Sequence, residues 1–306
     1  MEVMMKKRRS IVLFLLVSLI FASCTYSDKA TANKFHSLIA DRNLEKAIRS
    51  QLNLSKEVEL TKDHLESLTK LDAYSSQIKS IEGLEYAINL EELNIADNEV
   101  DNLQPLSNLK KLQVLLLGYN NIKDLSPLSN CHSLTALYIH YNQVDSLKPL
   151  NNLVNMEKIT LEHNNISSLE GIENLKKLNN LYAGSNKITE ISPISNLISL
   201  ETVYLYDNAI KDISPIQDLV NIKALELQNN QIKDISALNK LTQIDNINLE
   251  NNQIEDFSVL VKLAEEGAFD NKFEGLDYDV NIANNSVTIE YEVLIGRLKY
   301  MGVRVK

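Results

Sequence analysis

Asparagine recurs every 22 residues through most of this chain, and no insertion interrupts the spacing. A fixed period of this length is the signature of a solenoid, in which each repeat forms one coil and buries its apolar face against its neighbours. Apolar residues bracket every asparagine in the same way. They precede Asn120 as Leu112-x-x-Leu115-x-Leu117 and follow it as Ile122-x-x-Leu125-x-x-Leu128. The eight repeating asparagines are Asn98, Asn120, Asn142, Asn164, Asn186, Asn208, Asn230 and Asn252.

This spacing of leucines around an asparagine is the pattern of a leucine-rich repeat. Each Leu-x-Leu predicts a short strand, because alternate side chains of a strand point to opposite faces. An asparagine side chain offers one acceptor and two donors, so we expect it to satisfy the buried backbone of the turns. We therefore predict an α/β solenoid, a leucine-rich-repeat horseshoe with a parallel β-sheet on its concave face and a helical cap at its N-terminal end.

The prolines indicate what the outer side of each coil can form. Proline fixes φ and has no N–H group, so a long helix cannot pass through the phase of the repeat that it occupies. We expect short 3₁₀ turns on this convex side. Gly83, Gly171 and Ala237 fill the same phase in other units. The five prolines, all at this phase, are Pro105, Pro127, Pro149, Pro193 and Pro215.

The N-terminal segment has the pattern of a secretory signal. Basic residues 6–9 precede an apolar run over residues 11–21, and small residues then lead to Cys24. The run is short for a membrane span, which needs ~20 residues. A cysteine at this place resembles the lipobox of bacterial lipoproteins, and the resemblance implies cleavage before Cys24 and diacylation of its sulfur. Plain secretion and a retained anchor helix remain the alternatives.

The charge of the chain restricts its partners. The formal net charge is −10, and the segment before Cys24 contributes +4 from its bases and −1 from Glu2, so the mature chain carries −10 − 3 = −13. Such a balance argues against nucleic acid, since phosphate binding needs clustered lysine and arginine. The negative charge also argues against broad electrostatic adhesion to anionic lipids, so the acyl group on Cys24 is the only expected contact with a membrane. We expect a monomer without a cofactor. We also expect no disulfide, because Cys131 replaces a leucine of the core.

The sequence divides into five predicted segments. The leader and its tether come first, and a helical cap begins before Leu44 and includes a second helix N-capped by Thr61. In the C-terminal cap we predict a helix over residues 258–266 and strands over 278–282 and 286–291. The segments are a signal peptide at 1–23, a tether at 24–40, the N-terminal cap at 41–67, nine repeats at 68–265 and the C-terminal cap at 266–306.

Several stretches resemble the internalins, a family of bacterial surface proteins. They are similar to the N-terminal cap and first repeat of that family at residues 43–47, 68–73 and 81–87, and to its later repeats at 210–216. The resemblance covers about residues 41–263. It implies a protein that binds another protein on the concave face of its sheet, in adhesion or in contact with a host or envelope protein. Here the lipobox replaces the Leu-Pro-x-Thr-Gly sorting signal as the anchor.

Tyrosines gather in the columns that are predicted to point outward from the concave face. The repeat framework does not require aromatic residues there, and tyrosine is favoured at binding hot spots. Packing of aromatic side chains on the sheet is the structural alternative. The candidate ligand-binding residues are Tyr74, Leu116, Tyr119, Tyr138, His140, Tyr141, Tyr182, Tyr204, Tyr206 and Glu226.

Three other readings of the same face stay open. A stripe of tyrosines also suits sugar rings, so a glycan ligand is an alternative to a protein. His140, Glu162 and His163 lie close enough in the repeat to suggest zinc, although exposed polar side chains are commoner. Glu226 and Glu250 have the predicted spacing of a glycosidase pair, but an open sheet gives no obvious means of raising a carboxyl pKa. We therefore expect no enzyme activity and assign no metal ligand.

Overall fold

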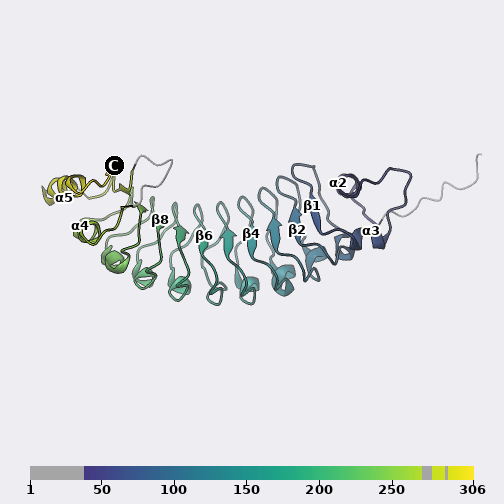
Figure 1. Cartoon of the computed structure of the whole chain (residues 1–306), viewed down its shortest axis with the longest axis horizontal. Helices are drawn as coiled ribbons and strands as arrows, with labels where there is room; N and C mark the ends of the chain where they lie inside the picture. The colour runs from purple at the N-terminus through teal and green to yellow at the C-terminus, as the bar shows by residue number, and fades with distance from the viewer. Residues whose placement is uncertain (1–37, 271–277, 287–288) are drawn as a thin grey trace, which may run out of the picture. The chain divides into compact units, whose positions relative to one another are not determined.

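The computed structural model describes residues 38–270, 278–286 and 289–306 of the chain. The predicted signal peptide, most of the tether and Cys24, the predicted site of lipidation, lie outside these ranges. Ten strands form one sheet in which every neighbouring pair is parallel and the spatial order is the order of the sequence. In Figure 1 the strands from β1 to β8 lie one after another along a single stack of coils. The predicted leucine-rich-repeat solenoid is thus confirmed.

Strands β1 to β9 have three residues each, and every residue pairs with the one 22 positions later in the next coil, whereas β10 has two residues and pairs with β9 at a separation of 33. Leu115, for example, pairs with Leu137 in the register of the sheet. The central residue of each strand is buried while its neighbours face outward, as the alternation of Leu-x-Leu predicts. The strands are β1 Lys70–Asp72, β2 Glu92–Asn94, β3 Val114–Leu116, β4 Ala136–Tyr138, β5 Lys158–Thr160, β6 Asn180–Tyr182, β7 Thr202–Tyr204, β8 Ala224–Glu226, β9 Asn246–Asn248 and β10 Val280–Asn281.

The repeating asparagines bond the backbone of neighbouring coils. Asn164 is typical of this asparagine column: its Nδ2 donates to the carbonyl oxygens of Ile139 and Leu161 at 2.9 and 3.0 Å. Its Oδ1 accepts from the N–H of Val144, 20 residues earlier, at 2.9 Å. The side chain therefore satisfies backbone groups that no water reaches, which is the role expected from the sequence.

The asparagine column has a ninth member that the fixed period did not reveal. Asn285 donates to the carbonyl oxygens of Leu249 and Ile282 and accepts from the N–H of Ile254 at 3.1 Å. It follows Asn252 by 285 − 252 = 33 positions, eleven more than the 22 of the other repeats. A longer last coil therefore keeps the same hydrogen bonds.

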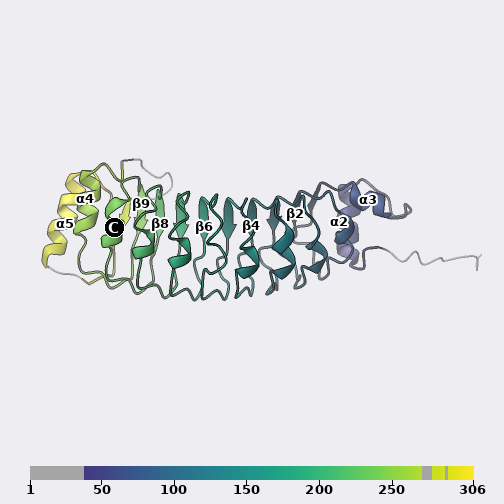
Figure 2. The ribbon, with the colours of Figure 1, turned by 90° about the horizontal axis from the view of Figure 1, so that it is seen from below.

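Short 3₁₀ helices lie on the side of most coils opposite the strand (Figures 1 and 2). Pro105 is at the start of the 3₁₀ helix Gln104–Leu106, and the other four prolines begin theirs in the same way. The fifth repeat differs, since no 3₁₀ helix occurs in the described residues between β5 and β6. There Gly171 turns with φ of +111°.

Two helices cover the N-terminal edge of the first coil. Helix α2, Arg42–Gln51, is N-capped by Asp41 and buries Leu44 and Ile48. The helix α3, Lys62–Glu66, begins at Thr61, whose side chain accepts from the backbone N–H of His64. Both helices are where the sequence predicts them. Within the described ranges, no helix is long and apolar enough to cross a membrane.

The C-terminal segment only partly follows the prediction. Helix α4, Ser258–Glu265, ends before Gly267 as expected, and β10 forms inside the first predicted strand. The predicted strand at 286–291 is wrong, because helix α5, Ile289–Tyr300, begins within it and lies beside α4 (Figures 1 and 2). Its Leu294 and Leu298, four residues apart, pack against the core at helical spacing. The alternation of apolar and polar residues over residues 286–291 was too short to indicate a strand against this helical spacing.

Candidate functional site

The exposed face of the sheet gathers aromatic side chains over strands β3 to β7. The register places Leu116, Tyr138, Thr160, Tyr182, Tyr204 and Glu226 side by side on successive strands. A second column, two residues further along each coil, contains His140 and Tyr206. We call the aromatic residues of this face the aromatic patch: Tyr119, Tyr138, His140, Tyr141, His163, Tyr182, Tyr204 and Tyr206.

Three of these residues form a continuous stack, here called the aromatic stack. The rings of Tyr119 and Tyr141 lie 4.4 Å apart with an angle of 10° between their planes. Tyr141 and His163 lie 4.0 Å apart at 17°. Tyr141 is thus enclosed by a ring on each face, and the stack presents mainly ring edges and hydroxyl groups to solvent.

The backbone beneath the aromatic stack has a left-handed conformation. The φ angles of Tyr119, Tyr141 and His163 are 56°, 53° and 54°. A bulky L-residue in this region carries a cost of ~1–2 kcal/mol. The stack occupies the position directly before each repeating asparagine, where the other coils place small or polar residues with the same sign of φ. Those residues are Ser75, Asp97, Ser185, Asp207, Asn229, Asn251 and Asn284.

Two glycines make room for the second aromatic column. A Cβ atom on Gly184 would lie 2.4 Å from the ring of Tyr206, and one on Gly118 would lie 2.5 Å from the ring of His140. Each ring therefore lies directly over the glycine of the preceding coil. His140 also has its Nδ1 3.3 Å from the Oγ1 of Thr160, one strand further along. These contacts fix the orientation of both rings.

Lys158 lies between two tyrosines of the patch. Its Nζ is 5.2 Å from the ring centre of Tyr138 and 5.3 Å from that of Tyr182. Such distances are those of cation–π contacts. Tyr182 in turn meets Tyr204 edge to face, with ring centres 4.9 Å apart. Lys158 was not predicted as a site residue, because its position in the repeat precedes the columns that carry the tyrosines.

A hollow of about 390 Å³ opens in the middle of the patch. Thr160 is small compared with Tyr138 and Tyr182 on either side of it in the same column, and this difference in size leaves the space. The Oε2 atom of Glu162 is buried and has no hydrogen-bond partner. The lining residues are Tyr138, His140, Tyr141, Lys158, Thr160, Glu162, His163, Tyr182 and Tyr206.

Burial shifts the pKa values of several groups on this face. Desolvation raises the pKa of the Glu162 and Glu226 carboxyls and lowers that of His140. Burial, with the nearby charge of Glu226, raises the pKa of Tyr204 to about 12. The expectation that an open sheet would leave carboxyl pKa values alone was therefore wrong, since the crowded side chains exclude water from both carboxyls.

Tyr74 and Glu226 lie at the margins of the patch. Tyr74 is 59% exposed and is separated from His140, in the same column, by Ala96 and Gly118. Glu226 is only 8% exposed, and side-chain hydrogen bonds to Asn248 and Gln228 oppose the rise in its pKa. The structure thus brings most of the candidate residues together but leaves Tyr74 apart.

The residues considered for metals are arranged for other contacts. Among the residues that the structure describes, no three His, Cys, Asp or Glu side chains are grouped to hold a metal ion. Asp279, which with Asn281 forms an Asp-x-Asn pattern that suggests a calcium loop, is fully buried, and its carboxylate accepts from the Nε of Arg304 at 3.0 Å. His163 is part of the aromatic stack, with its ring against Tyr141.

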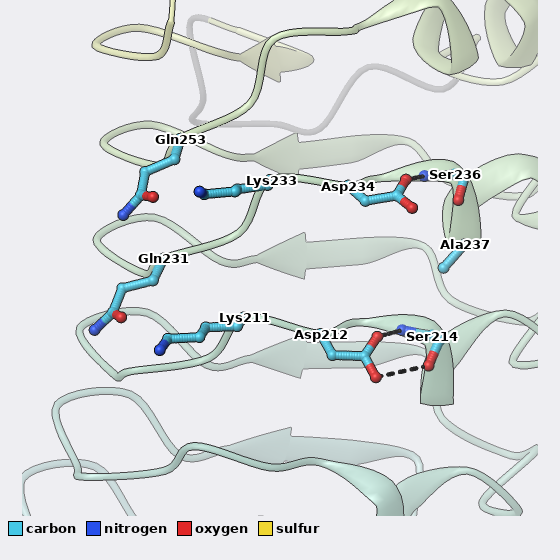
Figure 3. Close-up of a pocket in the computed structure, with 9 residues that line it drawn as sticks. All are labelled: Lys211, Asp212, Ser214, Gln231, Lys233, Asp234, Ser236, Ala237 and Gln253. Atoms are coloured by element: carbon cyan, nitrogen blue, oxygen red, sulfur yellow. Dashed lines mark hydrogen bonds between the residues drawn. The ribbon is translucent and has the colours of Figure 1, made fainter.

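A second hollow lies on the flank of the coils and belongs to the repeat framework. Figure 3 shows Lys211 and Lys233 extending in parallel from successive coils. Asp212 and Asp234 each accept from the N–H of the serine two residues later, at 2.7 and 2.8 Å. These contacts begin the 3₁₀ helices, which is the usual local role of aspartate at a turn. We therefore interpret this hollow as a product of the turns.

Comparison with known proteins agrees with the repeat architecture. A family model described as leucine-rich repeats in two copies matches residues 110–152, 176–218, 198–236 and 220–262. No match is found among curated proteins.

Solved structures give a more specific relation. Internalin C2 from Listeria monocytogenes shares 30% sequence identity with a TM-score of 0.65, over 69% of this chain and 94% of the other. The internalin InlF from the same organism shares 27% identity with a TM-score of 0.50, over 87% of this chain and 97% of its own. A leucine-rich-repeat protein from Leptospira interrogans has the same fold at 20% identity and a TM-score of 0.60, over 81% and 74%.

Proposed function

The chain belongs to the internalin-like leucine-rich-repeat proteins, and on that basis we propose that it binds another protein through the aromatic patch. Leucine-rich repeats of this kind are typical protein-interaction modules. The observation that carries the proposal is the aromatic stack. Tyr119, Tyr141 and His163 occupy a left-handed position that other coils fill with serine, aspartate or asparagine. Strain of this kind persists where the surface has a task besides folding.

The dimensions of the patch suit a protein partner. Its five strands, at ~4.8 Å spacing, span about 20 Å across the sheet, and neighbouring side chains can extend the contact toward the ~800 Å² per partner of a standard interface. Tyrosine edges and hydroxyls combine apolar area with hydrogen bonding, and few rotatable bonds are lost on binding. We propose that the protein works in adhesion or in contact with a host or envelope protein.

The arrangement of the rings favours a protein over a glycan. A sugar ring would pack against the open face of an aromatic side chain. Both faces of Tyr141 are covered by Tyr119 and His163, and Lys158 lies over the rings of Tyr138 and Tyr182. The binding we propose is also non-catalytic. The side chain of Glu226 is hydrogen-bonded within its own column, and the carboxylate of Glu250 accepts from Asn281 at 2.9 Å.

Replacing the aromatic stack with asparagines is expected to weaken binding while leaving the fold stable. The variant Tyr119→Asn, Tyr141→Asn, His163→Asn loses ring stacking of ~0.5–1.5 kcal/mol per pair. Relief of the left-handed backbone, at ~1–2 kcal/mol per residue, offsets that loss. Arrays of purified extracellular domains and of glycans, probed with the full chain and with this stack variant, test the proposal. We expect protein spots that the variant binds about tenfold or more weakly.

Tyr300→Asn is the matched control, because Tyr300 is 93% exposed on α5, outside the strands of the patch. Its binding should equal that of the unchanged protein. If the stack variant bound the same protein spots with unchanged affinity, or if only glycans were bound, the patch would not be a protein-binding surface.

We further propose that the protein is anchored outside the cytoplasm by acylation of Cys24. Cys24→Ser removes the sulfur that would carry the lipid, so incorporation of a labelled fatty acid in a bacterial host should fall to background. Cys131→Ala is the control, because the chain has two cysteines and the thiol of Cys131 is buried, with its pKa raised to about 11 by burial. Label that persists in the Cys24→Ser protein would contradict the anchor.

A further inference from the structure

The hollow in the aromatic patch contains an acceptor that nothing in the protein satisfies. Glu162 Oε2 is buried without a hydrogen-bond partner. Two other carboxylates of this face do have amide groups as hydrogen-bond partners. Glu226 accepts from Asn248 and Gln228, and Glu250 accepts from Asn281 and Asn284. A buried polar atom is almost always paired in a native protein. Gln228 Oε1 and Asn246 Oδ1 are also buried without a partner, but neither residue lines the hollow. Glu162 lines it beside Lys158, whose charge acts on the carboxyl, so a group that enters the hollow is the partner to be sought for this oxygen.

The walls of the hollow favour a cation. Tyr138, Tyr182 and Tyr206 line it, and the faces of aromatic rings attract positive charge. Lys158 demonstrates this preference within the chain, since its ammonium lies 5.2 and 5.3 Å from the ring centres of Tyr138 and Tyr182. Its side chain is only half-buried, so it can swing toward solvent and leave the rings to another cation.

The negative charge around the hollow also favours a cation. Asp97 and Asp207 extend the column of the aromatic stack on both sides, and Glu226 follows Tyr204 on the next strand. The chain as a whole carries a net charge of −10. A basic partner would be attracted over a distance and held in register by such a field.

We propose that the hollow over Thr160 is a socket for one lysine or arginine side chain of the protein partner, which donates to Glu162 from between the tyrosines. This inference rests on the proposed function and makes it specific, because it names the chemical group that the patch recognises. A neutral donor would satisfy Glu162 but would gain nothing from the aromatic walls.

The test uses a display library of random peptides selected on the full-length protein. Selection on the unchanged protein should enrich peptides that contain lysine or arginine. Glu162→Gln should remove that enrichment, because it keeps the shape and loses the charge. Glu250→Gln is the matched control, a part-buried carboxyl in the same column as Glu162 but outside the hollow, and should keep the enrichment.

One enriched peptide then gives a quantitative result. Norleucine in place of its critical lysine should weaken binding to the unchanged protein about tenfold and weaken binding to Glu162→Gln by a smaller factor, because only the aromatic rings then distinguish the two peptides. Lys158→Gln should strengthen binding of the lysine peptide, because a competing ammonium is gone. Circular dichroism of each variant verifies its fold.

The outcomes separate the two proposals. Enriched peptides without a basic preference, a preference that survives Glu162→Gln, or no enriched peptide at all would overturn the socket. Peptides that bind the stack variant as well as the unchanged protein would contradict the proposed function itself.

Discussion

Asn164→Ala is expected to lower the free energy of unfolding by ~1–3 kcal/mol. The substitution leaves the N–H of Val144 without its partner in a side-chain site that is 8% exposed, whereas the carbonyl oxygens of Ile139 and Leu161 lose one of two donors and still accept from Asn142 and Asn186. Each unsatisfied buried group costs ~1–3 kcal/mol. Urea denaturation followed by circular dichroism measures the change.

Asn165→Ala provides the comparison at the next position. The side chain of Asn165 is exposed, and its Oδ1 accepts only from the Nζ of Lys187 at 2.8 Å. Its loss should change the unfolding free energy by no more than ~0.5 kcal/mol. Equal losses for the two variants would mean that the asparagine column does not stabilise the coil through its backbone contacts.

Gly171→Pro should destabilise the protein by more than ~3 kcal/mol, although five other repeats have proline at this phase. Gly171 has φ of +111°, which proline cannot adopt. A Cβ atom there would lie 2.3 Å from the carbonyl oxygen of Leu147. The substitution also removes the N–H that donates to Glu173 Oε2 at 2.8 Å. The midpoint of urea unfolding should fall accordingly.

Ala237→Pro is the matched substitution at the same phase. Ala237 lies in the 3₁₀ helix Ser236–Lys240, where it corresponds to Pro215 of the preceding coil. Proline fits that conformation, so stability should be unchanged or increase by up to ~1 kcal/mol. A Gly171→Pro protein as stable as Ala237→Pro would show that the turn in the fifth repeat can relax to the common form.

The sequence predicted the parts of the fold that depend on repetition. The period of the asparagines determined which leucines are buried, which residues pair across strands, and where the prolines start 3₁₀ helices. Asn285 was missed because the last coil is longer, and α5 was missed because residues 286–291 alternate like a strand. Each of these segments occurs once in the chain, so no second repeat was present to indicate its structure.

The sequence predicted which columns of the sheet hold the candidate residues, but not which side chains contact one another there. The sequence placed Tyr119, Tyr141 and His163 on one face, whereas their left-handed backbone and their stacking appear only in three dimensions. A signal existed, since the same position elsewhere has Asp, Asn and Ser, residues that tolerate or suit such turns. The hollow was not foreseen, because it depends on the orientation of Lys158 and Glu162 rather than on their positions in the repeat.

The left-handed position before each asparagine has a consequence for how such a protein can change. The backbone there accepts serine, aspartate, asparagine, histidine and tyrosine with nearly the same φ. A substitution in one coil therefore alters the chemistry of one row without requiring a different backbone conformation in the rows beside it. Ligand preference can drift by single steps along the stack, and duplication of a whole unit would add another variable row to the same surface.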